Sequence, residues 1–380
     1  MSIVSAKHSC FQHAVRLMPH LTADSAAVLT IRLAPAKGLG MGWLVDVLIA
    51  LLGLAHAIAS GLYFSREERW WLWPIAWVLA TTSCIVAAQT HPVLGSGLFA
   101  AMVALWTIWW LLIRPSAKRN WVPENCIQAT ASIHDGILTI HNVRNFNWTD
   151  KRTFAEAWED RSYELAGLNG LDLFVCTWGD PRIAHIMVSF DFTDRPPLCF
   201  SIETRREIGE RWTPLAGFMK SYELLMLAAD ELDVVRSRIN LRNEDVRLYR
   251  VYSTPEMRRR ILARYVKQIN KLARRPRFYN TVFANCTIEV ALLIRAAGQN
   301  VPFDWRLLVS GHVPEYLYDL KLLDQTRPFV ELKALADISS KLKAADADPA
   351  YSRRIRVGIP DPQIVATATN VIHANANPTQ

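Results

Sequence analysis

The sequence lacks the cysteine patterns that identify a metal site or a disulfide-linked fold. Its six cysteines include no CxxC pair and no Cys/His spacing typical of zinc ligands. One bridge between Cys126 and Cys176 in an oxidising compartment stays open as an alternative to free thiols. We therefore expect no bound metal and no cofactor.

Patterns for nucleic-acid binding are also missing. The chain is basic, with a formal charge of +8, but no Arg/Lys run alternates with aromatic residues. The basic clusters Arg258–Arg260 and Arg274–Arg277 fall in helix-like stretches. We interpret them as solvated helix faces, with a lipid-headgroup contact as the alternative, and expect no nucleic-acid partner.

Apolar residues are in excess, at 51% of 380 positions, and the excess is concentrated in three runs. The runs cover about Gly42–Phe64, Trp70–Gln89 and Val93–Ile113, and each approaches the roughly 20 residues that a membrane-spanning helix needs. Tryptophans lie near the run ends, where their rings favour the membrane interface. Residues 41–113 are therefore predicted to form three transmembrane helices, because buried core helices would retain a polar face.

The sequence before the first run is less informative. Residues 1–40 show no clear periodicity and no cleavable signal, and Met41 is an alternative start of the protein. Basic residues in this tail favour a cytoplasmic N-terminus, which would place the domain after three crossings outside the cytoplasm. Basic residues directly after the third run favour the opposite orientation.

Beyond Arg114 the pattern becomes a mixture of strands and helices, which predicts an α+β domain over residues 114–323. A hairpin is expected over 131–142 with its turn at Asp135-Gly136. From residue 324 to 380 the chain reads as a partly disordered tail. Further strands are predicted over 171–177, 182–192, 197–204 and 245–252. Helices are predicted over 150–165, 217–230, 255–273 and 286–298.

Two neighbouring strands are predicted to bring a histidine and a carboxylate together. A turn centred near Asp194 pairs Met187 with Ser201 and His185 with Glu203 on one face of the sheet. The functional interpretation is a carboxylate that orients an imidazole. The alternative is a salt bridge between His185 and Glu203 on an exposed face of the sheet. When the strand register is the sole evidence, this alternative is favoured.

Cys286 is predicted to lie in the first turn of a helix. Asn285 is a good N-cap residue before it, and Gly298 is a natural residue just after the helix end. The helix dipole and free N–H groups at such a position stabilise a thiolate. A buried structural cysteine is the alternative.

Several segments together resemble a bacterial family. NVRNFNW (142–148), AHIMVSF (184–190), FSIETRREIGE (200–210), ADELDVVRSR (229–238) and YNTVFANCT (279–287) occur in the family's order. The chain is similar, over roughly 142–323, to the family named after the N-terminal periplasmic domain of Lnb, a lipoprotein N-acyltransferase. That family resembles permuted papain-like thiol enzymes of the NlpC and lecithin:retinol acyltransferase type.

The resemblance implies Cys286 as nucleophile and His185 as general base, in a periplasmic domain held at the bacterial inner membrane by a multi-pass block with a cytoplasmic N-terminus. Glu203 is the candidate that orients His185, with Ser201 as runner-up. Cys286 or Thr287 would supply the oxyanion N–H, supported by Asn285 and Asn280. Two arginines are candidates for binding a headgroup or for structural ion pairs with Glu207 or Glu210; they are Arg205 and Arg206.

The resemblance leads us to expect a cysteine-dependent acyltransferase or acyl hydrolase that acts on membrane lipids or lipoproteins through a thioester. A thiol amidase or peptidase of the cell envelope and a non-catalytic binding module are the alternatives. His312 follows Cys286 in the chain and is the rival of His185 as base.

Overall fold

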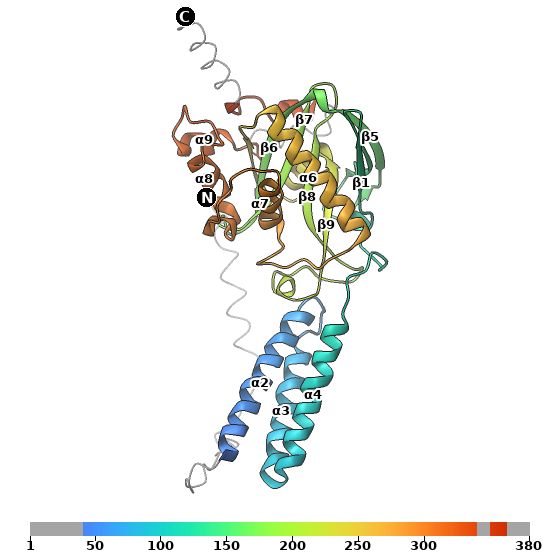
Figure 1. Cartoon of the computed structure of the whole chain (residues 1–380), viewed down its shortest axis with the longest axis vertical. Coiled ribbons are helices and arrows are strands. Elements are labelled where there is room, and N and C mark those ends of the chain that lie inside the picture. Colours follow the sequence, from blue (N-terminus) through green and yellow to red (C-terminus); the bar gives the residue numbers. More distant parts are fainter. Residues whose placement is uncertain (1–40, 340–349, 363–380) are drawn as a thin grey trace, which may run out of the picture. The chain divides into compact units, whose positions relative to one another are not determined.

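The structure is a computed structural model that describes residues 41–339 and 350–362 (Figure 1). Expectations for residues 1–40 lie outside the described residues. Contacts along the chain divide it into two compact units, residues 1–48 and residues 49–380. In the first unit only the opening turns of helix α2 are described, so the account below concerns mainly the second.

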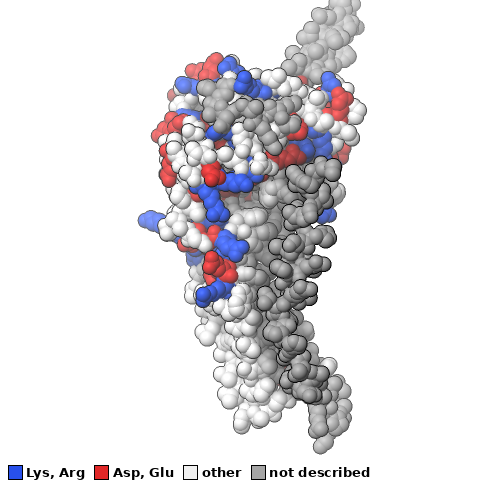
Figure 2. Space-filling model, turned by 180° about the vertical axis from the view of Figure 1, so that it is seen from behind, with Lys and Arg blue, Asp and Glu red and all other residues white. Residues whose placement is uncertain are grey.

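Three helices lie close to the predicted apolar runs. They are α2 (Met41–Phe64), α3 (Leu72–Thr90) and α4 (Pro92–Leu112). By length and composition all three can cross a membrane. On the side shown in Figure 2, the helical surface is white and free of Lys, Arg, Asp and Glu, whereas the domain surface carries both signs of charge. The helical block is thus a membrane anchor.

Helices α3 and α4 form a tight hairpin. A side chain on Gly95 of α4 would collide with the backbone of Ala88 in α3, because a Cβ there would overlap the Ala88 nitrogen. Cys84 and Phe99 are buried in the contact beside Gly95. Close helix approach through a small residue is a common way for helices to pack in a membrane.

The remaining residues form an α+β domain around a mixed sheet. Within the described residues, eight strands pair in the order β1-β2-β9-β8-β7-β6-β10, with β5 added beside β2, and only the β2–β9 pair is parallel. A separate two-stranded sheet joins β3 (Asn147–Trp148) to β4 (Phe154–Ala155). The strands of the large sheet are β1 (Thr130–His134), β2 (Ile137–Arg144), β5 (Trp158–Glu164), β6 (Leu168–Thr177), β7 (Ala184–Phe192), β8 (Leu198–Arg205), β9 (Glu223–Asp230) and β10 (Asp245–Arg250).

Each face of the sheet has its own hydrophobic core. On one face pack α6 (Pro255–Arg274) and α7 (Cys286–Ala296), which Figure 1 shows crossing in front of the strands. On the other face pack α5 (Glu231–Arg236), the π-helical turn 237–241 that continues it, and α11 (Tyr351–Arg354). Two further short helices follow α7 in the chain, α8 (Val313–Asp319) and α9 (Phe329–Leu335).

Several sequence predictions are confirmed. The hairpin of β1 and β2 turns at Asp135 and Gly136, whose φ angles of 48° and 78° are those of the predicted tight turn. Strands β6, β7, β8 and β10 and helices α6 and α7 lie where periodicity placed them. The predicted register of β7 and β8 is also confirmed, since Met187 lies opposite Ser201.

Two predicted helices are wrong. The helix expected over 150–165 is instead the strands β4 and β5, because β5 pairs with β2 and buries Tyr163 beneath it. The helix expected over 217–230 is mainly β9, an interior strand between β8 and β2. All eight residues of β9 are buried, so its apolar run carries no period that would distinguish strand from helix.

The folded domain also extends beyond the predicted boundary at residue 323. Ile338, Tyr351 and Ile355 are almost fully buried in the second core. Arg356 reaches the buried carboxylates Asp172 and Glu231 at 2.7 and 2.6 Å. The described parts of the segment expected to be a tail are therefore integral to the fold.

Candidate active site

The nucleophile candidate Cys286 is the first residue of α7. The side chain of Asn285 caps the helix, because its Oδ1 accepts from the N–H groups of Thr287 and Ile288 at 3.0 and 2.8 Å. Its amide nitrogen donates to the carbonyl of Thr281. The predicted N-cap is confirmed, and it fixes Cys286 at the positive end of the helix dipole.

The turn before α7 is organised by Asn280. Its Oδ1 accepts from the N–H groups of Val282 and Phe283 at 2.9 and 3.0 Å, and its backbone pairs with Ala284. Asn280 therefore shapes the loop that leads into Cys286. It is also one of the supporting residues of the site that the sequence predicts.

His185 lies near the start of β7, where the sheet opens. The ladder between β7 and β8 reaches Met187–Ser201, while β8 stays paired with β9 as far as Arg205. Since the strands separate here, the His185 ring has room between β8 and the start of α7. Helix α7 packs on β7 and β8 at this point, and the Cys286 sulfur lies 4.0 Å from the Ala184 carbonyl oxygen.

A short chain of hydrogen bonds runs behind the imidazole. His185 Nε2 lies 2.7 Å from Ser201 Oγ, and Ser201 Oγ donates to Glu203 Oε1 at 2.6 Å. Nε2 is also 3.2 Å from the same carboxylate oxygen. Ser201 and Glu203, which the sequence offered as alternatives, thus both contact His185. Because Nε2 is engaged, Nδ1 is the nitrogen left for the sulfur.

The carboxylate is held by an arginine that the sequence did not single out. Arg238 Nη2 lies 3.3 Å from Glu203, and Nη1 pairs with Glu244 at 2.9 Å. Arg238 is buried and comes from the π-helical turn after α5. It holds the Glu203 carboxylate in place. Arg238 is the last residue of the segment ADELDVVRSR, and the sequence of that segment does not indicate this contact.

The electrostatics of the cluster favour a charged histidine. Burial disfavours the imidazolium, but the Glu203 carboxylate outweighs it and raises the pKa of His185 to about 9. Burial likewise opposes the carboxylate, yet the His185 charge holds the pKa of Glu203 well below its ordinary value. His185 therefore carries a proton at neutral pH.

The same proton stabilises a thiolate on Cys286. Burial works against the thiolate, but a hydrogen bond from His185 and its positive charge lower the pKa of Cys286 below that of a free thiol. Thr287 Oγ1 lies 3.9 Å from the sulfur and also lowers this pKa. The pKa shifts of Cys286 and His185 are those expected of a thiolate–imidazolium pair.

The other described cysteines are free thiols of a different kind. Cys126 and Cys176, the suggested disulfide pair, are both unbonded. Burial raises the pKa of Cys176 to about 12, and the pKa of Cys199 lies well above its ordinary value for the same reason. Among the described residues, no group of His, Cys, Asp or Glu side chains is arranged to hold a metal ion.

The two oxyanion candidates differ in what their N–H groups already bind. The Thr287 N–H donates to the Asn285 cap, so it is engaged. Cys286 is the first residue of the helix, where an N–H has no partner within the helix. Of the pair that the sequence offered, the Cys286 N–H is thus the better placed donor.

The two headgroup candidates have structural partners. Arg205 is buried against the Trp121 ring and donates to the carbonyl oxygens of Asn125 and Cys126. Arg206 donates to the carbonyl of Glu210 at 3.2 Å and lies 3.5 Å from the Glu124 carboxylate.

Neither arginine forms the expected carboxylate pair, because Glu207 and Glu210 bind Arg119 and Arg66 instead. Arg205 and Arg206 thus make structural contacts, as one of the two alternatives expected, but their partners are not the expected carboxylates of Glu207 and Glu210.

The rival base His312 has a partner of its own. Its Nδ1 lies 2.7 Å from the Glu315 carboxylate, and its ring packs beside Trp305. The adjacent Ser310 binds the backbone of Ala184, so this turn supports the start of β7. The contacts of His312 are thus with Glu315 and Trp305, whereas His185 is the histidine that lowers the pKa of Cys286.

The fold and the site together define a class of protein: a membrane-anchored α+β domain with a cysteine and a histidine in one cluster. Residues 154–311 match the family model described as Lnb N-terminal periplasmic domain. The match contains the whole cluster from His185 to Cys286. The chain matches no curated protein and no solved structure. The chain thus combines a region similar to the Lnb N-terminal periplasmic domain with an anchoring helical block.

Proposed function

We propose that this domain is a cysteine-dependent acyltransferase that takes an acyl group from a membrane lipid or lipoprotein ester. The observation that carries the proposal is the cluster at the start of α7. His185 lowers the pKa of Cys286, and His185 itself is bonded to Ser201 and paired with Glu203. Nucleophile, base and orienting group in this order are the parts that thiol acyl transfer requires.

The first step forms a thioester. The Cys286 thiolate attacks the ester carbonyl carbon, and the Cys286 N–H at the helix start stabilises the oxyanion. The carbon–oxygen bond then breaks, and the leaving alcohol takes the proton from the His185 imidazolium. The products are an acyl group on Cys286, a free alcohol and a neutral His185.

The second step transfers the acyl group. An amine or a water molecule attacks the thioester carbonyl while His185 removes its proton. The carbon–sulfur bond breaks, which regenerates the thiolate and the imidazolium. An amine acceptor gives an amide, as in lipoprotein N-acylation, and water gives a free fatty acid.

Exposed aromatic side chains near the site favour a lipid substrate over a cell-wall peptide. Trp178 follows Thr177, which pairs with Ala184 beside the sulfur, and Trp178 lies 6.3 Å from Trp212 between ring centroids. Phe283, three residues before Cys286, is 76% exposed. Amphipathic tryptophans on a surface are typical of contact with the membrane interface.

The loop that carries Trp212 is also bonded to the anchor. Ser221 donates to the carbonyl of Tyr63 near the end of α2, and Lys220 donates to that of Trp110 near the end of α4. Tethering at the bilayer raises the effective concentration of a membrane-dissolved substrate. The match to a periplasmic domain and the three candidate spans support a multi-pass protein of the bacterial inner membrane with a cytoplasmic N-terminus and a periplasmic site.

The chain order supports a permuted papain-like fold as part of the proposal. In NlpC-type enzymes of that order, a strand histidine precedes a cysteine at a helix start. His185 on β7 and Cys286 on α7 have this order.

Intact-mass analysis of the purified full-length protein, incubated with phospholipid vesicles, tests the proposal. Wild type should gain the mass of a fatty acyl group, which hydroxylamine removes, whereas Cys286→Ala should gain none. Cys199→Ala is the matched control and should acylate as wild type does. Cleavage of muropeptides without an acyl adduct would instead support the amidase, and neither activity would leave a binding module.

A further inference from the structure

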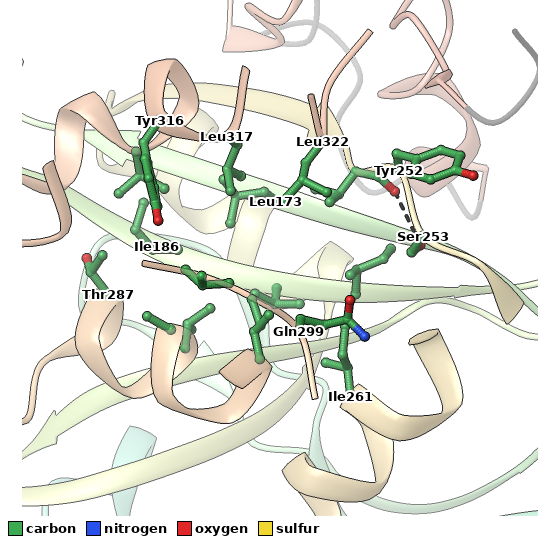
Figure 3. Close-up of a pocket in the computed structure, with 18 of the residues that line it drawn as sticks. Leu173, Ile186, Tyr252, Ser253, Ile261, Thr287, Gln299, Tyr316, Leu317 and Leu322 are labelled. Atoms are coloured by element: carbon green, nitrogen blue, oxygen red, sulfur yellow. Dashed lines mark hydrogen bonds between the residues drawn. The ribbon is translucent and has the colours of Figure 1, made fainter. Parts of the chain in front are cut away.

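A cavity of about 100 Å³ lies between α7, α6 and α8 and the strands β6 and β7 (Figure 3). Its wall is mostly aliphatic, with Leu173, Ile186, Val188, Val290 and Ile294 among the lining residues. Interiors of proteins are normally close-packed, so a void of this size beside a reactive group calls for an occupant.

Two of the lining residues lie at the site of Cys286. Ile186 lines the cavity and is on β7 two residues after Ala184, whose carbonyl oxygen lies 4.0 Å from the sulfur. The Thr287 hydroxyl lies 3.9 Å from the sulfur, and Thr287 also lines the cavity. One end of the cavity therefore begins at the wall of the nucleophile site.

Helix α7 connects the nucleophile to the length of the cavity. Thr287, Val290, Ala291 and Ile294 all line it, and their spacing places them on one face of the helix. Figure 3 shows Thr287, Ile186 and Tyr316 at one end, and Ser253 and Tyr252 at the other. The cavity thus leads away from the sulfur towards a polar end.

We propose that this cavity receives the first carbons of the fatty acyl chain while its carbonyl is bonded to Cys286. An engineered apolar cavity of about 150 Å³ stays dry and binds benzene, so a lined space of 100 Å³ suits a short run of methylene groups. This inference rests on the function proposed above and adds a chain-binding site to it.

The binding site predicts a preference for longer chains that one substitution removes. Ala291 lines the cavity, so Ala291→Phe fills it without touching Cys286 or His185. Leu292→Phe is the matched control, because Leu292 is the next residue of the same helix, is 45% exposed and is not part of the wall.

The test compares hydrolysis of p-nitrophenyl octanoate and p-nitrophenyl acetate by full-length protein in detergent. Ala291→Phe should lower the octanoate-to-acetate ratio of kcat/KM by about 10-fold or more, since each lost methylene contact costs that much discrimination. The acetate rate should stay within about twofold of wild type. Leu292→Phe should leave the ratio unchanged. An unchanged ratio in Ala291→Phe, or equal loss of both esters in a folded protein, would overturn the inference.

An enlarging variant covers the case in which Ala291→Phe does not fold. Ile294→Ala should raise the ratio for esters longer than octanoate, with Leu292→Ala as its control, and an unchanged chain-length profile would overturn the inference. Wild type without any Cys286-dependent turnover would reject the proposed function itself. Cys286-dependent turnover with no effect of the cavity variants would reject only the chain-binding site.

Discussion

Cys286 and Cys199 are both buried cysteines, yet the pKa values of their thiols are shifted in opposite directions. Cys199 lies in an interior strand, where burial raises its pKa well above the ordinary value. Cys286 is opposed by the same burial but lies at a helix start beside His185, which lowers its pKa. The comparison shows that the partners of a buried cysteine, and not burial alone, decide the direction in which its pKa is shifted.

The largest change should come from removing the partner of Cys286. His185→Ala removes the hydrogen bond and the positive charge that lower the pKa of Cys286, while burial stays, so this pKa should rise towards that of Cys199. Loss of a general base should lower the rate of acyl transfer by about 10²–10⁴-fold. Ester hydrolysis at pH 7 measures this loss. His312→Ala is the control, and a larger loss there would make His312 the base.

A smaller change should follow from weakening the support of His185. Glu203→Gln removes the charge that raises the pKa of His185, so this pKa should fall from about 9 towards its ordinary value. We expect a rate loss between about 10-fold and 100-fold, the cost of one charged hydrogen bond. The alkaline limb of the pH–rate profile, where His185 loses its proton, should move to lower pH.

Glu244→Gln is the matched control for Glu203→Gln. It removes the other carboxylate of Arg238 but has no contact with His185. Its profile should keep the wild-type alkaline limb. Equal shifts in both variants would mean that Arg238, rather than Glu203, determines the charge of His185.

The smallest change in activity should come from a substitution of Cys199. Cys199→Ala removes a small buried side chain and should lower the free energy of unfolding by about 1 kcal/mol. Acyl transfer should stay within about twofold of wild type, because Cys199 has no partner in the cluster. Thermal melting and ester hydrolysis check the two effects, and a large loss of activity would show that the two thiols are coupled.

Much of this comparison could be predicted from local patterns. The Asn285 cap and the apolar period of α7 placed Cys286 at a helix start, and the turn near Asp194 fixed the register that brings Glu203 to His185. Both features depend on residues close together in the chain, where side-chain period and capping chemistry are informative.

The remainder depends on contacts between distant segments. Arg238 reaches Glu203 from a π-helical turn 35 residues further along the chain, and no local period signals such a contact. Strand β9 is buried on every side, so its sequence reads equally well as a helix. Arg356 is essential to the second core only because Asp172 and Glu231 are buried opposite it.

The most direct test of the account is the pH dependence of iodoacetamide alkylation, followed at each cysteine by peptide mass spectrometry. The alkylation of Cys286 in the full-length protein should have its midpoint below pH 9, the pKa of an ordinary thiol. In His185→Ala the midpoint should move above that of wild type, while Cys199 should stay unreacted in both. A wild-type midpoint at or above 9, unchanged by His185→Ala, would contradict the thiolate–imidazolium pair.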